Sequence, residues 1–214
     1  MKQFLQENKV FIALYIIFLI AGGIIITTFE KGNEILYFNS LHTPLLNQFF
    51  KRTTRLAEGP LFLFIILITI RLSYGKGMIL ALNLGLVSLV TFFLKTIVFH
   101  DSMRPSVLFE GKVPLNFVQG VEVLHFNSFP SGHTSSAFGV FFMLSLLTID
   151  KRWSILLFVL ALAVGISRVY LLQHFFRDIY AGSLVGVIVS SIFYLTFVRS
   201  RFYENISWRE KKLI

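Results

Sequence analysis

Long apolar runs limit what this chain can fold into more than any other feature of its sequence. A helix that spans a membrane needs about 20 mainly apolar residues. Six stretches come close to that length: residues 10–28, about 58–74, 77–99, about 132–149, 153–172 and about 179–198. The second is the weakest, because Arg71 lies near its end. We therefore expect an all-α, polytopic membrane protein with six transmembrane helices.

Composition agrees with a membrane-embedded chain. Of 214 residues, 55% are hydrophobic and 14% are charged, whereas about a quarter of the residues in a soluble domain are charged. The absence of cysteine excludes disulfides and thiolate metal sites. Many basic residues flank the apolar runs, so the net charge of +9 indicates anionic lipid head groups and no nucleic acid as partner. No linker divides the chain, and we expect residues 1–214 to form a single domain.

The first apolar run bears on topology. It is longer than the apolar region of a signal peptide and no small-residue cleavage site follows it cleanly, so we expect a retained helix. Six spans put both termini on one side. If the termini and the turns at 71–76 and 150–152 are cytoplasmic, that side holds slightly more than half of the 20 Lys and Arg residues. The positive-inside rule therefore favours cytoplasmic termini, in a bacterial inner membrane, by a small margin.

The segment between the first two runs, residues 29–57, has a different pattern. It mixes Leu and Phe with Lys51, Arg52 and Arg55 at helical spacing. This pattern predicts an amphipathic helix that lies at the membrane interface and anchors the chain there.

Ionisable residues at the edge of a membrane span are functional candidates, and three clusters fall on the same predicted face. The first is LKTIVFHDSMRPS, residues 94–106. Lys95 lies about one turn from the end of an apolar run, and Arg104 follows in the loop. Alternatively, Lys95 extends its amine to the interface along apolar surface, and Arg104 is a solvated loop charge.

The second cluster is FPSGHTSSAF, residues 129–138. Pro130 ends the preceding segment, and Ser131 can cap the helix that follows. A helix N-terminus offers free N–H groups and a positive dipole end to an anion. Gly132 allows the anion to approach the backbone closely, and His133 lies in the first turn beside it. An ordinary helix cap explains Ser131 but leaves His133 unexplained.

The third cluster is ISRVYLLQHFFRDIYAG, residues 166–182. His174 and Asp178 are four residues apart, which predicts that they share one helix face. A carboxylate that orients an imidazole prepares it to act as nucleophile or base. Arg168, nearly two turns earlier, can point to the same face. The alternative is a polar helix contact, with Arg168 and Arg177 as anchors at the membrane edge.

Together the clusters provide three cations, a helix N-terminus and two histidines, one of them with an aspartate. This set suits a tetrahedral, multiply charged anion such as phosphate. His133, His174 and Asp178 are possible zinc ligands, but the surrounding cations would repel a metal ion. A second carboxylate cluster for magnesium is not found in the sequence.

Two of these patterns resemble a known family. Pro130-Ser131-Gly132-His133, and Ser167-Arg168 followed after five residues by His174 and after three more by Asp178, match motifs of the type 2 phosphatidic acid phosphatases, the PAP2 superfamily. The resemblance covers about residues 60–195. The first motif of that family, Lys before Arg-Pro, departs from the usual pattern. Eight residues separate Lys95 from Arg104 where the family usually has six, and no other lysine lies closely upstream.

The resemblance implies a helical bundle like that of the related haloperoxidases and a metal-independent reaction without a cofactor. His174 would be the nucleophile that forms a phosphohistidine, and Asp178 would orient it. His133 would protonate the leaving group and then activate water. The residues expected to hold the phosphoryl oxygens are Lys95, Arg104, Ser131, Gly132 and Arg168.

The function implied is dephosphorylation of a membrane lipid phosphate or pyrophosphate near the extracytoplasmic face, as in phosphatidylglycerophosphate and undecaprenyl pyrophosphate phosphatases. The motifs recognise phosphate, so they do not identify the lipid. A lipid phosphotransferase with the same intermediate remains an alternative. A non-catalytic lipid-phosphate-binding protein is disfavoured because both histidines and Asp178 are present, and a haloperoxidase because the chain has six apolar runs. The sequence does not indicate the oligomeric state, or whether residues 106–128 form a lid or a connector.

Overall fold

A computed structural model describes residues 6, 8–207, 209 and 211–212. Every regular element in these residues is helical, which confirms the all-α class. The α-helices are α2 (Lys9–Thr28), α3 (Asn33–Ser40), α4 (Pro44–Thr53), α5 (Gly59–Leu72), α6 (Tyr74–Phe93), α7 (Pro105–Leu108), α8 (Gly132–Leu147), α9 (Trp153–Tyr170), α10 (Phe176–Phe193) and α11 (Arg201–Glu204). A 3₁₀ turn covers Thr54–Ala57, and two π-helices cover Leu94–Val98 and Tyr194–Val198.

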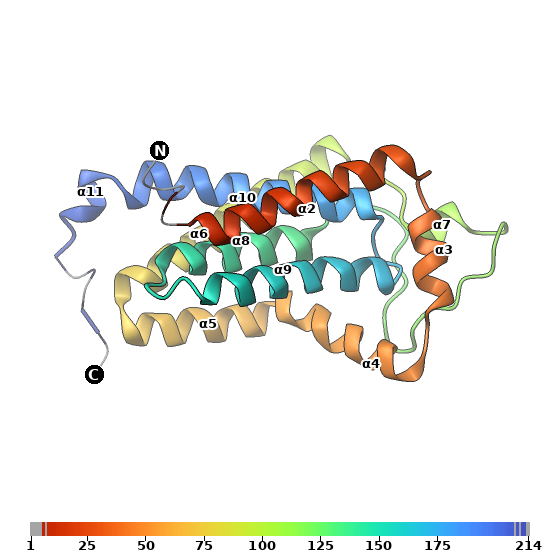
Figure 1. Cartoon of the computed structure of the whole chain (residues 1–214), viewed down its shortest axis with the longest axis horizontal. Coiled ribbons are helices and arrows are strands. Elements are labelled where there is room, and N and C mark those ends of the chain that lie inside the picture. The colour runs from red at the N-terminus through yellow and green to blue at the C-terminus, as the bar shows by residue number, and fades with distance from the viewer. Residues whose placement is uncertain (1–5, 7, 208, 210, 213–214) are drawn as a thin grey trace.

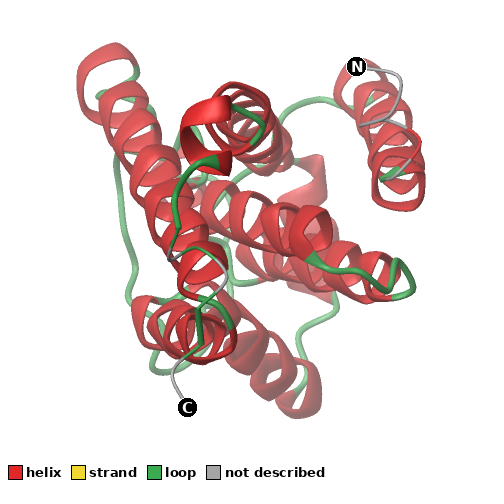
Figure 2. Cartoon of the chain, turned by 90° about the vertical axis from the view of Figure 1, so that its left-hand side faces the viewer, coloured by secondary structure: helices red, strands yellow, loops and turns green. Residues whose placement is uncertain are grey.

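Helix α8 forms the centre of a bundle and packs against α6, α9 and α10 (Figures 1 and 2). Its side chains Phe138, Phe142 and Met143 are almost completely buried. Helices α8 and α10 approach closely because α10 has glycine where they cross: a Cβ at Gly186 would lie 2.5 Å from the Ser135 carbonyl oxygen. Small residues allow such close backbone contact between membrane helices.

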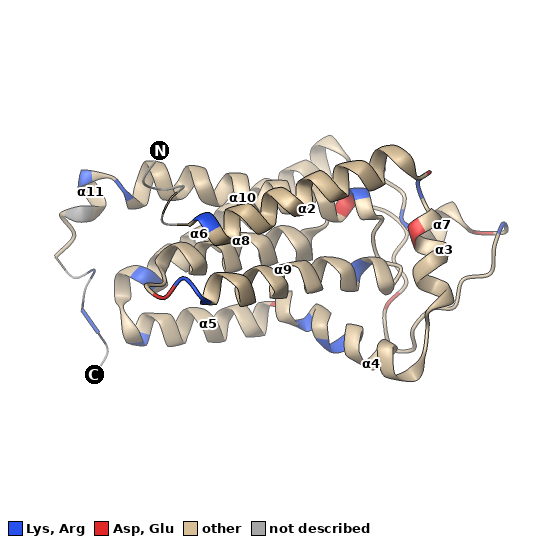
Figure 3. Cartoon of the chain, viewed as in Figure 1, with Lys and Arg blue, Asp and Glu red and all other residues tan. Residues whose placement is uncertain are grey.

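Among the residues that the structure describes, four helices are long and apolar enough to cross a membrane. They are α2, α6 with its π-helical extension, α9, and α10 with its π-helical extension. The other two predicted spans, α5 and α8, are apolar but have 14 and 16 residues. The structure therefore agrees with a multi-span membrane protein, while the count of six spans stays a prediction. Most charged residues lie toward the two ends of the bundle, with few between them (Figure 3).

The segment predicted as one interfacial helix, residues 29–57, consists of two α-helices and a 3₁₀ turn. Helix α3 ends at Ser40, and a new helix begins where Thr43 caps α4 by accepting a hydrogen bond from the Leu46 N–H, with Pro44 in the first turn. Leu45 and Phe49 on α4 are exposed, which agrees with an amphipathic surface. Both helices lie at the end of the bundle opposite the start of α2 and the helix α11 (Figure 1).

Candidate active site

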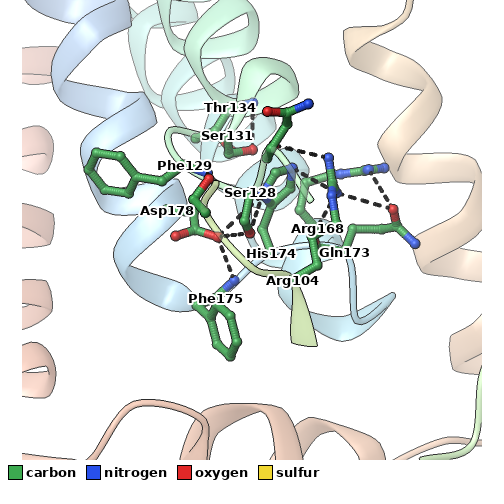
Figure 4. A network of polar contacts seen from close by, with 12 residues as sticks. Arg104, Ser128, Phe129, Ser131, Thr134, Arg168, Gln173, His174, Phe175 and Asp178 are labelled. Carbon is green, nitrogen blue, oxygen red and sulfur yellow. Dashed lines mark hydrogen bonds and ion pairs between the residues drawn. The ribbon is translucent and has the colours of Figure 1, made fainter. Parts of the chain in front are cut away.

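The three polar clusters meet at that same end of the bundle. Lys95 lies in the π-helix after α6, Arg104 in the following loop, Arg168 in the last turn of α9, and Ser131 at the start of α8. The Ser131 N–H donates a hydrogen bond to the Asp178 carbonyl, 3.0 Å away, and so joins the second cluster to the third. Figure 4 shows how the polar side chains converge.

His174 and Asp178 form a pair, but they do not share a helix face as predicted. Helix α9 ends at Tyr170 and α10 begins at Phe176, so His174 lies in the turn between them. Asp178 is in the first turn of α10, and its Oδ2 lies 3.4 Å from His174 Nδ1. The same oxygen accepts a hydrogen bond from the Phe175 N–H, 3.0 Å away. A tight turn and a helix start therefore create the contact that the four-residue spacing indicated.

The environment of His174 suits a nucleophile. When Nδ1 donates to the carboxylate, Nε2 keeps its lone pair, and it lies 3.4 Å from Arg104 Nη1. His174 is 1% exposed. Burial, and then the positive charges of Arg104, Arg168 and Lys95, hold the pKa of His174 well below its ordinary value. The imidazole is therefore neutral and able to attack near neutral pH.

The N-terminus of α8 has the expected cap and an open approach. The Thr134 N–H and hydroxyl both donate to Ser131 Oγ, at 3.4 and 2.9 Å. If Gly132 carried a Cβ atom, its nearest neighbour from another part of the chain would be the Thr91 methyl group, 4.0 Å away. The backbone at Gly132 is therefore open to a ligand. His133 is half-buried and lines a cavity of about 530 Å³ that Arg168 and Gln173 also line. An anion at the free N–H groups of α8 would therefore lie beside His133.

The two arginines are buried and held by neutral acceptors. Arg104 is 5% exposed, and it donates from Nε to the Phe126 carbonyl and from Nη1 to the Gln173 carbonyl, at 2.9 and 2.7 Å. Burial lowers the pKa of Arg104, partly offset by the Asp178 carboxylate, but a guanidinium stays charged in proteins. Arg168 donates from Nη1 to Thr54 Oγ1 at 2.7 Å.

Comparison with known proteins identifies the family. The PAP2 superfamily matches residues 76–202, which is more than half of the chain. The chain belongs to the PAP2 superfamily. The resemblance inferred from the motifs is therefore confirmed.

Relatives and solved structures agree with this membership. The bacitracin transport permease protein BcrC of Bacillus licheniformis is 38% identical to this chain over 86 residues. The aligned region covers 40% of this chain and 41% of BcrC, so the match spans less than half of the length of BcrC. The structure of LpxE from Aquifex aeolicus superposes with a TM-score of 0.65 at 28% identity, covering 78% of this chain and 96% of LpxE. A transmembrane PAP2-type phosphatidylglycerolphosphate phosphatase from Bacillus subtilis superposes with a TM-score of 0.61 at 26% identity. This superposition covers 90% of this chain and 98% of the phosphatase chain.

The unusual first motif of this PAP2 chain has a structural counterpart. Helix α6 widens at Leu94–Val98 into a π-helix, in which the Phe99 N–H bonds to the Leu94 carbonyl. A π-helix holds more residues in each turn than an α-helix, so it absorbs part of the longer Lys95–Arg104 spacing. Lys95 is half-buried and interacts electrostatically with Arg104, Arg168 and Asp178. The structure thus brings Lys95 to the cluster despite the spacing.

The structure adds three residues that the sequence did not single out. Ser128 donates from Oγ to Asp178 Oδ2 at 2.5 Å, Gln173 contacts both arginines, and Thr54 accepts from Arg168. Ser128 and Gln173 stand next to recognised motifs, and that position was the only available signal. Thr54 belongs to a distant segment without a motif. Within the described residues, no group of three or more His, Asp or Glu side chains is arranged to hold a metal ion.

Proposed function

We propose that this PAP2 protein removes phosphate from a membrane lipid phosphate or pyrophosphate through a phosphohistidine on His174, without a metal ion. The observation that carries the proposal is the orientation of His174. Its Nδ1 is directed to Asp178 and its Nε2 faces Arg104, in a pocket of positive charge. The membership of the family and the phosphatase from Bacillus subtilis support the reaction class.

In the first step, His174 Nε2 attacks phosphorus and the bond from phosphorus to the leaving oxygen breaks. The negative charge of the bound phosphate favours the protonated form of His133, and His133 then donates this proton to the leaving oxygen. The charge on the transferring phosphoryl group is stabilised by Arg104, Arg168 and Lys95 together with the N–H groups at the start of α8. In the second step, His133 removes a proton from water, the water oxygen bonds to phosphorus, and the P–N bond breaks. Phosphate leaves, and both histidines return to their starting forms.

We further propose six spans with cytoplasmic termini and the site near the extracytoplasmic face. Two features support this topology. The site lies at the end of the bundle opposite the start of α2 and the helix α11, and slightly more basic residues fall on the predicted cytoplasmic side. Large exposed side chains along α2, including Ile17, Ile20 and Ile24, provide an outer surface for lipid. A lipid head group would then enter the cavity while the acyl chains stay in the bilayer.

The first test is phosphate release from a panel of lipid phosphates by purified protein in EDTA, with vanadate as inhibitor. His174→Ala should abolish release, because it removes the nitrogen that attacks phosphorus. His100→Ala, at an exposed histidine on the same side, is the matched control and should keep full activity. Full activity of His174→Ala would exclude the nucleophile, and strict dependence on added divalent metal would exclude the metal-free reaction. Transfer of phosphate to an acceptor lipid would favour the phosphotransferase.

A further inference from the structure

Gln173, the residue before His174, connects the two arginines. It lies in the turn between α9 and α10 and is 3% exposed. Its side-chain oxygen Oε1 lies 3.4 Å from Arg104 Nη1 and 3.4 Å from Arg168 Nη2. Its Nε2 donates to the Glu122 carbonyl at 2.8 Å. One amide thus contacts both guanidinium groups (Figure 4), and it joins them to the loop at 106–128 through Glu122.

The neutrality of this amide matters because the two arginines repel each other. Both are buried, and they interact electrostatically. The partial negative charge of an amide oxygen holds two guanidinium groups side by side without cancelling their charge. A carboxylate in the same place would form strong charge-assisted pairs with them and would compete with a phosphate for the same donors. A neutral acceptor therefore preserves the positive potential that an anion requires.

The contacts of Arg168 support this view. Its Nη1 donates to Thr54 and its Nη2 to Gln173. Its Nε is buried and has no hydrogen-bond partner among the described residues. A buried donor without a partner is costly, so an anion in the cavity that accepts from Nε would complete the set. Hydrogen bonds from Nη1 and Nη2 fix the orientation of the Arg168 guanidinium, and Nε remains available to donate to the ligand.

We propose that Gln173 is a positioning residue that fixes both phosphate-binding arginines while leaving their charge available. This inference rests on the proposed function, because the anion is the phosphoryl group of the substrate. Gln173 itself does not touch the reacting atoms. Its role should therefore be measurable as a change in the affinity for phosphate-like ligands. A charge placed at residue 173 should change that affinity more than a change in side-chain shape does.

The test compares Gln173→Glu with the wild type, using vanadate binding by titration calorimetry, thermal unfolding, and KM and kcat. Gln173→Glu keeps the shape and pairs with both arginines. We expect it to unfold at or above the temperature of the wild type, yet to weaken vanadate binding and raise KM by about tenfold, with a smaller effect on kcat. Gln48→Glu adds the same charge at an exposed position on α4 and should leave all four quantities unchanged.

A purely structural role for Gln173 predicts a different pattern. Stability and affinity would then move together, so unchanged vanadate binding in Gln173→Glu, or parallel losses of stability and binding, would overturn the inference. Gln173→Leu, which removes both amide contacts, should lose stability and affinity together. If the wild type bound vanadate but released no phosphate, the proposed function would be wrong while the role of Gln173 in anion binding could still be measured. A wild type that did not bind vanadate would contradict both.

Discussion

Two regions meet at the candidate active site, and they contribute in different ways. The first consists of helices α6–α10 with the segments that join them, which the family match covers from residue 76 onward, and it supplies His133, His174, Asp178 and the three cations. The second is the segment 33–57, which precedes the match and supplies none of these groups. Yet Thr54 of this segment holds Arg168, and Glu34 accepts a hydrogen bond from the Phe176 N–H at the start of α10. The bundle brings the reactive groups, and the preceding segment helps to fix where they point.

Further contacts of this segment are directed to the last turn of α9. The ring of His42 lies 4.5 Å from that of Tyr170, and His42 Nε2 lies 3.0 Å from the Tyr170 carbonyl. The Tyr170 hydroxyl donates to Asn47 at 2.7 Å. Since Arg168 belongs to this turn, the segment supports the position of a phosphate-binding residue as well as covering the end of the bundle. The comparison predicts large effects on kcat from the first region and smaller effects on phosphate affinity from the second.

The largest effect is expected from Asp178→Asn in the first region. The side-chain amide can donate to His174 Nδ1, which would move the ring proton to Nε2 and remove the lone pair that attacks phosphorus. Loss of the correct tautomer costs about 10⁴-fold in kcat in a comparable His–Asp pair. Measurement of kcat with the best lipid phosphate checks this. The exposed control Asp101→Asn should retain activity, and a loss below tenfold for Asp178→Asn would show that the carboxylate does not set the tautomer.

A smaller effect, on affinity, is expected from Thr54→Val in the second region. Valine keeps the shape of threonine but removes the acceptor for Arg168 Nη1. A hydrogen bond to a charged group contributes about 1.5–3 kcal/mol, so we expect at least about a tenfold rise in KM and in the Kd of vanadate. The neighbouring Thr53→Val is the matched control, because the Thr53 hydroxyl bonds to the Phe49 carbonyl within α4. Equal effects of the two variants would limit the segment to a general role in stability.

The same division explains how much could be predicted from the sequence. The start of α8 was predictable because capping depends on neighbouring residues, and Ser131 caps it as expected. The contact of His174 with Asp178 was also predictable from spacing, although the turn that creates it was not. Thr54 could not be found, because its contact with Arg168 joins residues 114 positions apart. Neither residue carries a local signal of the other.

The membrane spans show a similar limit. Hydropathy located all the apolar runs, but it does not determine where a helix begins and ends. Helix α8 ends at Leu147, and its side chains pack mostly against protein, so burial in the bundle shapes this helix in addition to the thickness of a bilayer. The π-helix at Lys95 could not be predicted from apolarity alone, since both kinds of helix present the same composition.

The smallest effect is expected from Glu34→Gln, again in the second region. Its carboxylate accepts hydrogen bonds from the N–H groups of Phe176 and Gly32, at 3.1 and 2.9 Å. Glutamine keeps one acceptor but removes a negative charge from the N-terminus of α10, where charge contributes about 0.3–1 kcal/mol. We expect the unfolding temperature to fall by about 1–4 °C and kcat/KM to change by less than about fivefold.

Glu30→Gln is the control for this change, because it removes the same charge from an exposed position just before this segment. Glu30→Gln should change neither the unfolding temperature nor kcat/KM. If Glu34→Gln lowered kcat/KM as strongly as Asp178→Asn, then Glu34 would take part in the reaction itself, and the division between a reactive bundle and a supporting segment would be wrong. If instead only the unfolding temperature fell, Glu34 would stabilise the helix start without adjusting the position of Asp178 in its first turn, and Thr54 would carry the link between the two regions.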